Sequence, residues 1–587
     1  MVEKREASEL RHALHACRDS FASVGLFSLF VNLLMLVPAI YMLQVYDRVL
    51  TTLSGETLLM LTLVVIFLFA IMGLLELVRY RMLVRIGNRL DLRLGTRLYQ
   101  AMFQRSLITG SRQSAQPLSD LATLRQFLAG NGLLVFFDAP WVPVYLAVLF
   151  LFHPWLGLFA TLAGLLLLVL TVVGEKITQP LLSEAAAEQI HTNELVDANL
   201  RNAEALHAMG MLPDILARWS QSHRRCLAGQ SRASDRGETL ATAARVLRLL
   251  AQSLILGLGA WLVLRAELTP GTMIAGSIVM GRALAPIDRM IGTWKGCIAA
   301  RSAYRRLEEL LLQVPVESER MPLPKPKGEL RLEGVTATVP GGRIPVLRSI
   351  QFELASGEHL GIIGPSAAGK SSLARVMLGI WPVLSGTVRL DGADITSWSR
   401  DALGPFIGYL PQDIELFDGT IAENIARFGD LDSSRVVTAA RKAGVHEMIL
   451  SLGDGYDTVI ASGSGLSGGQ RQRLGLARAL YGDPVLVLLD EPNANLDDRG
   501  EQALAAAMAA LKREGVTLCV ISHRISVLKD MDRLLLLRDG EVQLFGARDE
   551  VMARLTVKPV PATATARTHM AAMTGLAGGR GDNEQRA

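Results

Sequence analysis

Two adjacent carboxylates, Asp490 and Glu491, follow an apolar run in the stretch LVLLDEPNANLDDRG, residues 486–500. The run is typical of a buried strand, and parallel sheets present ligands at the carboxyl ends of their strands. A metal ligand and a general base cannot be the same residue, so one acid of an adjacent pair can bind the metal while the other acts as the base. We expect Asp490 to hold Mg²⁺ and Glu491 to orient an attacking water or accept its proton. The alternative is a pair of acids that cap a helix.

A glycine-rich loop lies upstream, in HLGIIGPSAAGKSSLARVML, and matches G-x-x-x-x-G-K-[ST]. A short apolar strand precedes the loop and a helix follows it, so consecutive backbone N–H groups and the positive helix end form an anion site. Lys370 can reach the β- and γ-phosphates of a nucleotide, and the Ser371 hydroxyl can ligate Mg²⁺. The residues predicted to bind ATP here are Gly364, Pro365, Ser366, Ala367, Ala368, Gly369, Lys370, Ser371 and Ser372.

Further polar groups lie near the ends of other apolar runs. Gln412 stands in YLPQD, and His523 ends LCVISHR, where it can contact a γ-phosphate. The sequence GLSGGQRQRLGLARAL predicts a helix whose first N–H groups and serine hydroxyl face an anion. Because one phosphate loop already cradles one nucleotide, this second helix end is expected to face the nucleotide of another copy. Its residues are Ser467, Gly468, Gly469 and Gln470.

The composition separates a membrane part from a soluble part. Half of the 587 residues are hydrophobic and the mean hydropathy is +0.30, while a net charge of +4 gives no case for a nucleic-acid partner. The four cysteines have no metal-ligand spacing, which is typical of free thiols in a reducing compartment. About 20 apolar residues cross ~30 Å of hydrocarbon. Six segments qualify as spans: 23–45, 57–78, 132–152, 155–173, 247–263 and 273–293.

These segments predict an α-helical six-span domain followed by an α/β nucleotide-binding domain. The expected limits are a cytoplasmic N-terminal segment at 1–22, the membrane domain at 23–303, a linker at 304–329, the α/β domain at 330–557 and a disordered tail at 558–587. Seven arginines lie between Arg79 and Arg105, whereas the loops after the first and fifth spans hold only Arg48 and Arg265. The basic side faces the cytoplasm, so both termini are expected there. The polar connections 79–131 and 174–245 are expected to continue the spans as long helices.

Ionisable residues inside the predicted spans are costly and need a reason. Asp138 lies in FFDAPW, and Arg282, Asp288 and Arg289 lie in the sixth segment. One interpretation is that these side chains line a polar translocation path. The other is a local pair, such as Arg282 with Asp288, or side chains that reach to the interface.

The order and spacing of the motifs resemble those of the nucleotide-binding domain of ABC transporters. The resemblance implies a Walker A motif at 364–371, a Walker B motif that ends at Asp490 and a signature motif at 466–470. It implies ATP and Mg²⁺ as ligands, with Ser371, Gln412 and Asp490 around the metal. Glu491, Gln412 and His523 are the implied catalytic residues, and Asp497 of the D-loop is an implied nucleotide-site residue.

Within the ABC exporters, three stretches resemble type I secretion ATPase/permeases that export proteases and RTX proteins. They are YMLQVYDRVL, the region around FFDAPW, and DEPNANLD, in which Asn493 and Asn495 differ from the more common Thr/Ser and Ala. Because about 22 residues precede the first predicted span, we expect no N-terminal peptidase-like domain. The resemblance implies an inner-membrane exporter of an unfolded polypeptide with a C-terminal signal, a membrane-fusion adaptor and a TolC-like outer-membrane channel.

Two other functions remain open from the sequence, namely export of a lipid, drug or small peptide without such partners, and an ATPase that is only tethered to the membrane. Because one phosphate loop and one signature occur per chain, we expect a homodimer with two composite sites. Two stretches depart from the family pattern. Val339 stands where an aromatic residue usually stacks on adenine, and IASGSGLSGG lacks the acidic residue that often precedes the signature.

Overall fold

The computed structural model describes residues 9–110, 115–315, 320–321, 323–460 and 465–556. The chain forms two compact units, residues 1–317 and 318–587. The predicted tail at 558–587 and residues 461–464 before the signature lie outside the described residues, so the expectations for them stay untested.

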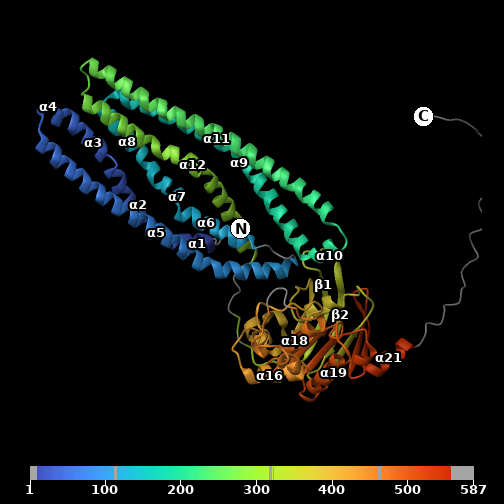
Figure 1. Ribbon diagram of the computed structural model, residues 1–587. Coiled ribbons are helices and arrows are strands. Elements are labelled where there is room, and N and C mark those ends of the chain that lie inside the picture. The colour runs from blue at the N-terminus through green and yellow to red at the C-terminus, as the bar shows by residue number, and fades with distance from the viewer. Residues whose placement is uncertain (1–8, 111–114, 316–319, 322, 461–464, 557–587) are drawn as a thin grey trace, which may run out of the picture. The chain divides into compact units, whose positions relative to one another are not determined.

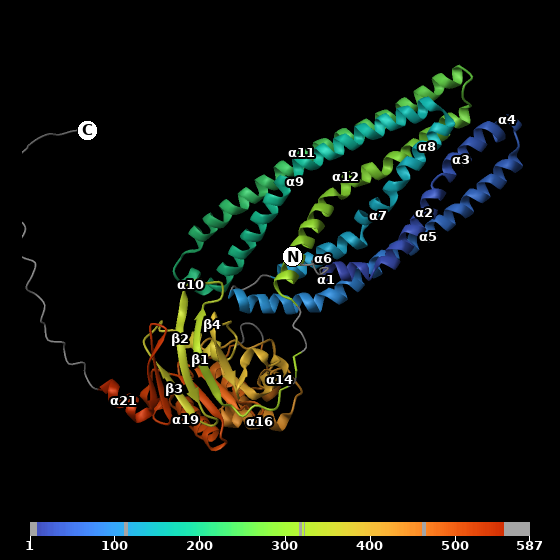
Figure 2. The same cartoon turned by 180° about the vertical axis from the view of Figure 1, so that it is seen from behind.

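The first unit is built from long helices, four of which have more than 40 residues (Figure 1). The helices α9 and α11 lie side by side in both views (Figure 2). The predicted helical extensions are present, because α5 runs without interruption through residues 55–109 and α9 through 154–201. The helices of this unit are α1 (Glu9–His15), α2 (Arg18–Leu34), α3 (Val37–Gln44), α4 (Leu50–Thr52), α5 (Gly55–Thr109), α6 (Gln116–Ala129), α7 (Asn131–Asp138), α8 (Val142–Phe152), α9 (Pro154–Arg201), α10 (Ala203–Ala208), α11 (Leu212–Leu264) and α12 (Pro270–Gln313).

Five helical stretches in the described residues are long and apolar enough to cross a membrane: Arg18–Thr52, Gly55–Thr109, Gln116–Phe152, Pro154–Arg201 and Leu212–Leu264. They contain the first five predicted spans. The sixth predicted span, 273–293, lies inside α12 but is not among the five. Because it carries Arg282, Asp288 and Arg289, its place as a span stays a prediction.

Two prolines of the predicted spans, Pro140 and Pro286, have different effects on the helical structure around them. Pro140 lies in a short 3₁₀ segment, Ala139–Trp141, that separates α7 from α8 within the third predicted span. Proline lacks an N–H group, so it interrupts the helical hydrogen bonds at this point. Pro286 lies inside α12, which continues past it as a helix.

The described residues of the second unit form three sheets. The largest has the order β12-β11-β3-β10-β9-β6, in which β12 alone runs antiparallel to its neighbour. An antiparallel sheet has the order β2-β1-β4-β5, and β7 pairs with β8. The strands are β1 (Leu330–Thr338), β2 (Pro345–Leu354), β3 (His359–Ile363), β4 (Ser385–Leu390), β5 (Ala393–Asp394), β6 (Ile407–Leu410), β7 (Gly419–Thr420), β8 (Val459–Ile460), β9 (Leu486–Asp490), β10 (Thr517–Ile521), β11 (Arg533–Arg538) and β12 (Glu541–Ala547).

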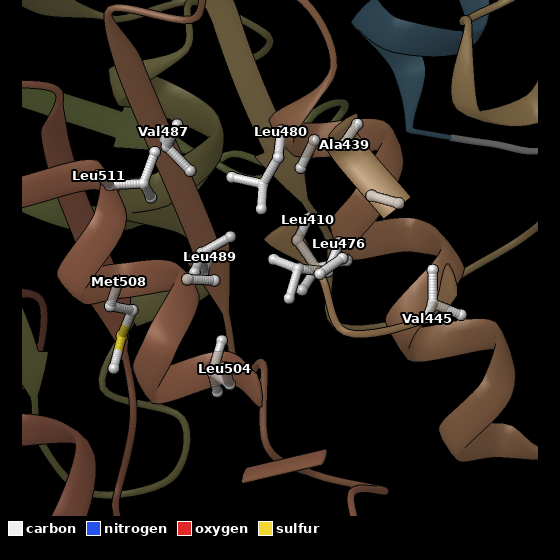
Figure 3. Packing of buried hydrophobic residues seen from close by; sticks show 14 of the residues in the cluster. Leu410, Ala439, Val445, Leu476, Leu480, Val487, Leu489, Leu504, Met508 and Leu511 are labelled. Atoms are coloured by element: carbon white, nitrogen blue, oxygen red, sulfur yellow. The ribbon is translucent and has the colours of Figure 1, made fainter. Parts of the chain in front are cut away.

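The central strands bury both faces, as expected for a parallel sheet. Alternate residues of β9 point to opposite faces, so Val487 and Leu489 join one core cluster while Leu486 and Leu488 join the other. Figure 3 shows Val487 and Leu489 among side chains of α18 and α19. The helices of this unit are α13 (Lys370–Met377), α14 (Arg400–Leu403), α15 (Ile421–Ile425), α16 (Ser433–Lys442), α17 (His446–Leu450), α18 (Gly468–Leu480), α19 (Asp498–Arg513), α20 (Ile525–Leu528) and α21 (Arg548–Thr556).

Candidate nucleotide site

The predicted site residues follow four neighbouring strands. The glycine-rich loop follows β3, His523 lies after β10, Glu491 follows β9, and Gln412 comes after β6. These strands are adjacent and parallel in the order β3-β10-β9-β6. The carboxyl ends of parallel strands meet at one edge, which is the usual place for a ligand in such sheets. The sheet order therefore brings together motifs that are far apart in the sequence.

The glycine-rich loop depends on two glycines with unusual backbone angles. Gly364 has φ +157°, and a Cβ atom there would lie 2.1 Å from the Leu537 carbonyl oxygen. Gly369 has φ +99° and precedes α13, which begins at Lys370. The Lys370 ammonium group donates to the carbonyls of Gly364 and Pro365, both at 2.9 Å. The loop backbone and its own lysine side chain are thus joined by two hydrogen bonds.

The Lys370 side chain is poised close to the acidic pair. It is 7% exposed, and burial lowers the pKa of Lys370 while Glu491 and Asp490 act in the opposite direction. A cation held in this way is suited to bind the β- and γ-phosphates without long side-chain rearrangement.

Asp490 ends β9 with an almost wholly buried carboxylate, 1% exposed. Among the described residues, neither of its oxygens has a hydrogen-bond partner of good geometry. Burial raises the pKa of Asp490, and the neighbouring Ser371 hydroxyl offsets only part of that rise. A buried carboxylate that adjoins a hydroxyl provides the kind of oxygen ligands that Mg²⁺ prefers.

An Asp490→Asn variant is expected to be more thermostable than the wild type without nucleotide at pH 7–8. Because burial raises the pKa of Asp490 above its unfolded value, the folded state holds the extra proton. The stability that this group contributes is therefore present below its unfolded pKa and is lost as pH rises through its folded pKa. The neutral amide of the variant does not ionise, so the variant does not undergo this loss of stability. The melting temperature should rise by a few degrees, since about 1 kcal/mol corresponds to ~2–4 °C in a domain of this size.

The control for this measurement is Asp413→Asn, which changes an exposed acid in the same region. Melting should be followed for the full-length protein in detergent from pH 4, near the ordinary pKa of an aspartate, to pH 8. An Asp490→Asn curve that runs parallel to the wild-type curve over this range would contradict the assignment of a strained buried charge.

The backbone turns left-handed at Glu491, with φ +49°. Such a conformation is rare outside glycine and often marks functional sites. The Glu491 carboxylate accepts a hydrogen bond from Gln412 Nε2 at 3.3 Å and lies 3.7 Å from His523 Nε2. The three predicted catalytic side chains are thus neighbours, although they come from three different strands.

The two asparagines of DEPNANLD have different surroundings. Asn493 is buried and accepts a hydrogen bond from the Ser522 hydroxyl at 3.3 Å, next to His523. Asn495 lies against the signature loop, where its carbonyl oxygen would be 2.7 Å from a Cβ atom at Gly469. The pair therefore links the end of β9 to both β10 and the signature loop of the same chain.

The signature and D-loop residues form helix caps in this chain. Ser467 and Gln470 form a reciprocal capping box at the start of α18. Asp497 caps α19 by accepting a hydrogen bond from the Gly500 amide at 2.8 Å. The predicted nucleotide contacts of these residues stay predictions, since a cap alone explains their types equally well.

Sequence reasoning missed Gln472. Its side chain is buried and donates to the Glu491 carbonyl oxygen at 3.1 Å, which helps to hold the left-handed turn. Together with Gln412, Gly468 and Asn495 it also lines a small cavity of 210 Å³. The available signal was a second glutamine two residues after Gln470, on a helix that otherwise buries apolar residues.

Val339 is 44% exposed in the turn after β1. A Val339→Tyr variant is expected to bind ATP about 5- to 150-fold more tightly, because base–aromatic stacking contributes ~1–3 kcal/mol. Ile344→Tyr, an exposed position in the same turn region, is the matched control. Titration of a fluorescent nucleotide measures both. Equal affinities for Val339→Tyr and the wild type would remove this position from the adenine site.

The helical first unit and this site define an ATP-hydrolysing, multi-pass transporter of the ABC class. Residues 347–494 match the ABC transporter family, and residues 21–284 match the ABC transporter transmembrane region. The chain is 45% identical over 546 residues to the type I secretion system ATP-binding protein PrsD of Rhizobium meliloti (strain 1021), with 92% of this chain and 94% of PrsD covered. The chain therefore belongs to the type I secretion branch of the ABC transporter family.

Two further likenesses agree with this membership. The cyclolysin secretion/processing ATP-binding protein CyaB of Bordetella pertussis is 30% identical, with 92% of this chain and 77% of CyaB covered. A solved bacterial Atm1-family ABC exporter with ATP bound has a TM-score of 0.76 at 23% identity, covering 92% of this chain and 97% of the exporter. The second likeness supports the fold alone.

Proposed function

We propose that this chain is the inner-membrane exporter of a type I secretion system and moves an unfolded polypeptide with a C-terminal signal out of the cytoplasm. The similarity to PrsD, which extends over nearly the full length of both chains, carries this proposal. In it, both termini and the ATPase domain face the cytoplasm, and a membrane-fusion adaptor and a TolC-like outer-membrane channel complete the path.

In the proposed mechanism, the glycine-rich loop and Lys370 bind the phosphates of ATP. Ser371, Gln412 and Asp490 would hold Mg²⁺, which supplies charge neutralisation to the phosphates when it is bound. The buried carboxylate of Asp490, which adjoins the Ser371 hydroxyl, supports this role. Glu491 orients the attacking water and accepts its proton, while His523 contacts the γ-phosphate. The proximity of Glu491 to both Gln412 and His523 supports this division of work.

Two copies of the chain form the proposed working unit. The signature of each copy, including Ser467 and Gly469, closes on the nucleotide held by its partner, with Asp497 at the same junction. One glycine-rich loop and one signature per chain support this arrangement. ATP draws the two domains together, and hydrolysis separates them. The spans then alternate their access between the two sides of the membrane.

The proposal is tested by deleting the gene and following polypeptides in the medium and in the cells. We expect at least one secreted polypeptide to accumulate inside, and wild-type protein but not Glu491→Gln should restore its release. Co-purification of the tagged wild-type chain from cells that express the neighbouring genes should recover an adaptor. Unchanged release of every secreted polypeptide would contradict the proposal and favour export of a lipid, drug or small peptide.

A further inference from the structure

A buried carboxylate links several helices of the first unit. Asp138, at the end of α7, is 3% exposed. One of its oxygens accepts hydrogen bonds from Asn32 at 2.9 Å and from Arg79 at 3.4 Å, and the other accepts one from Arg289 at 3.0 Å. Asp138 thus holds residues of α2, α5 and α12 together.

Three uncharged side chains, on one face of α2 and at its C-terminal end, contact the charged groups of this cluster. Ser28, Asn32 and Met35 follow at spacings of four and three residues, so they lie on one face. The Ser28 hydroxyl accepts a hydrogen bond from Arg79 at 3.2 Å, while Met35 offers only its sulfur, 3.5 Å from Arg282 Nη1. A thioether is a weak acceptor for a guanidinium group.

The local pair of Arg282 with Asp288 is not formed. Asp288 instead pairs with Arg248 of α11 at 3.3 Å. Within the described part of the chain, Met35 is the one recorded hydrogen-bond partner of Arg282. Arg282 is therefore left without a carboxylate.

The cluster has more cations than anions. It combines the three guanidinium groups of Arg79, Arg282 and Arg289 with the single carboxylate of Asp138. Arg79 Nε is buried and has no hydrogen-bond partner among the described residues. Buried charges are normally paired, so this excess of donors points to an acceptor that comes from outside the chain.

The positions of the arginines along α12 indicate which chemical group can act as the acceptor. Arg282 lies twelve residues after Pro270, where α12 begins, which corresponds to about 18 Å along a helix. If α12 enters the hydrocarbon layer at its first residue, Arg282 lies near the middle of the ~30 Å layer, out of reach of a lipid headgroup. Arg289 lies two turns further on the same face, and its side chain is 47% exposed. At the depth of Arg282, a guanidinium group that is only half-buried needs polar surroundings beside it.

We propose that Arg282 and Arg289 form a binding site for carboxylate groups of the polypeptide in transit. This site rests on the proposed function. Guanidinium groups pair with carboxylates through parallel hydrogen bonds, and two arginines about 10 Å apart along α12 can receive successive acidic side chains. Asp138 acts as the resident carboxylate that keeps Arg289 in position between passages.

The test uses the full-length protein in nanodiscs of phosphatidylcholine and a fluorescent oligoglutamate peptide, with oligoglutamine of equal length as the neutral probe. We expect oligoglutamate to bind the wild type, and to bind Arg282→Gln about tenfold more weakly, as for loss of one charged hydrogen-bond partner. Arg282→Lys should retain most of the binding. Arg305→Gln, an exposed arginine further along α12, should leave the affinity unchanged.

Three results would overturn the site. They are equal binding of both peptides, equal affinities of Arg282→Gln and the wild type, and equal losses in Arg282→Gln and Arg305→Gln. Binding that appears only when phosphatidylglycerol is added would identify an anionic lipid as the ligand and also overturn it. Failure of the site is distinct from failure of the proposed function, because a wild-type protein that binds no oligoglutamate yet restores polypeptide release in cells contradicts the site alone.

Discussion

A Glu491→Gln variant is expected to bind ATP with wild-type affinity and to hydrolyse it about 10²- to 10⁴-fold more slowly, the usual contribution of a general base. The amide keeps the size of the side chain and can still contact Gln412, which lies 3.3 Å from the carboxylate. What it loses is the capacity to accept a proton. Lys370 and the glycine-rich loop, which hold the phosphates, remain unchanged.

Turnover should be measured by phosphate release and ATP affinity by a fluorescent analogue, both on the full-length protein. Glu541→Gln, at an exposed position at the start of β12, makes the same chemical change away from the site. Wild-type affinity combined with lost turnover separates the chemical step from binding. Hydrolysis retained within a few-fold of the wild type would show that another group takes the proton.

The positions of the nucleotide motifs could be predicted because each one combines a local pattern with a general rule. A short apolar run, a glycine-rich loop and a helix identify the phosphate loop without knowledge of the rest of the chain. The rule that ligands bind at the carboxyl ends of parallel strands then brings Asp490, Gln412 and His523 to one edge. The strand order β3-β10-β9-β6 has this consequence.

The conformation of Glu491 could not be predicted in this way. A glutamate with φ +49° is locally unfavourable, and its cause is tertiary. The Glu491 amide donates to the Ile521 carbonyl oxygen at 3.0 Å, and Gln472 donates to the Glu491 carbonyl oxygen. Both partners come from other elements, so no pattern around residue 491 contains the information.

The ion pairs of the first unit show the same limit. The sequence places Arg282 and Asp288 six residues apart, a spacing that leaves a local pair open, whereas Asp288 pairs with Arg248 on a different helix. The lengths of the helices were easier to predict, since they follow from continuous apolar and helix-favouring stretches. Which charged side chains meet depends on how α11 and α12 pack.

Mixed dimers are expected to show that each ATP site is shared between two copies. Lys370→Ala weakens phosphate binding by the glycine-rich loop of its own copy. Ser467→Arg blocks the signature at the exposed start of α18. As homodimers, both variants should lose nearly all turnover. A dimer of one Lys370→Ala chain with one Ser467→Arg chain should keep one intact site, formed by the glycine-rich loop of the second chain and the signature of the first.

The decisive comparison places both substitutions in one chain and pairs it with a wild-type chain. Each composite site then carries one lesion, so this dimer should be inactive although it contains the same two substitutions. If each chain instead used its own signature, the activities would be reversed, because the wild-type chain would remain whole and the separated lesions would disable both chains. Two affinity tags and sequential purification isolate each mixed dimer, and phosphate release measures its turnover. The sign of the difference between the two dimers therefore decides whether the signature acts on the partner's nucleotide, independently of any loss of stability that the substitutions share.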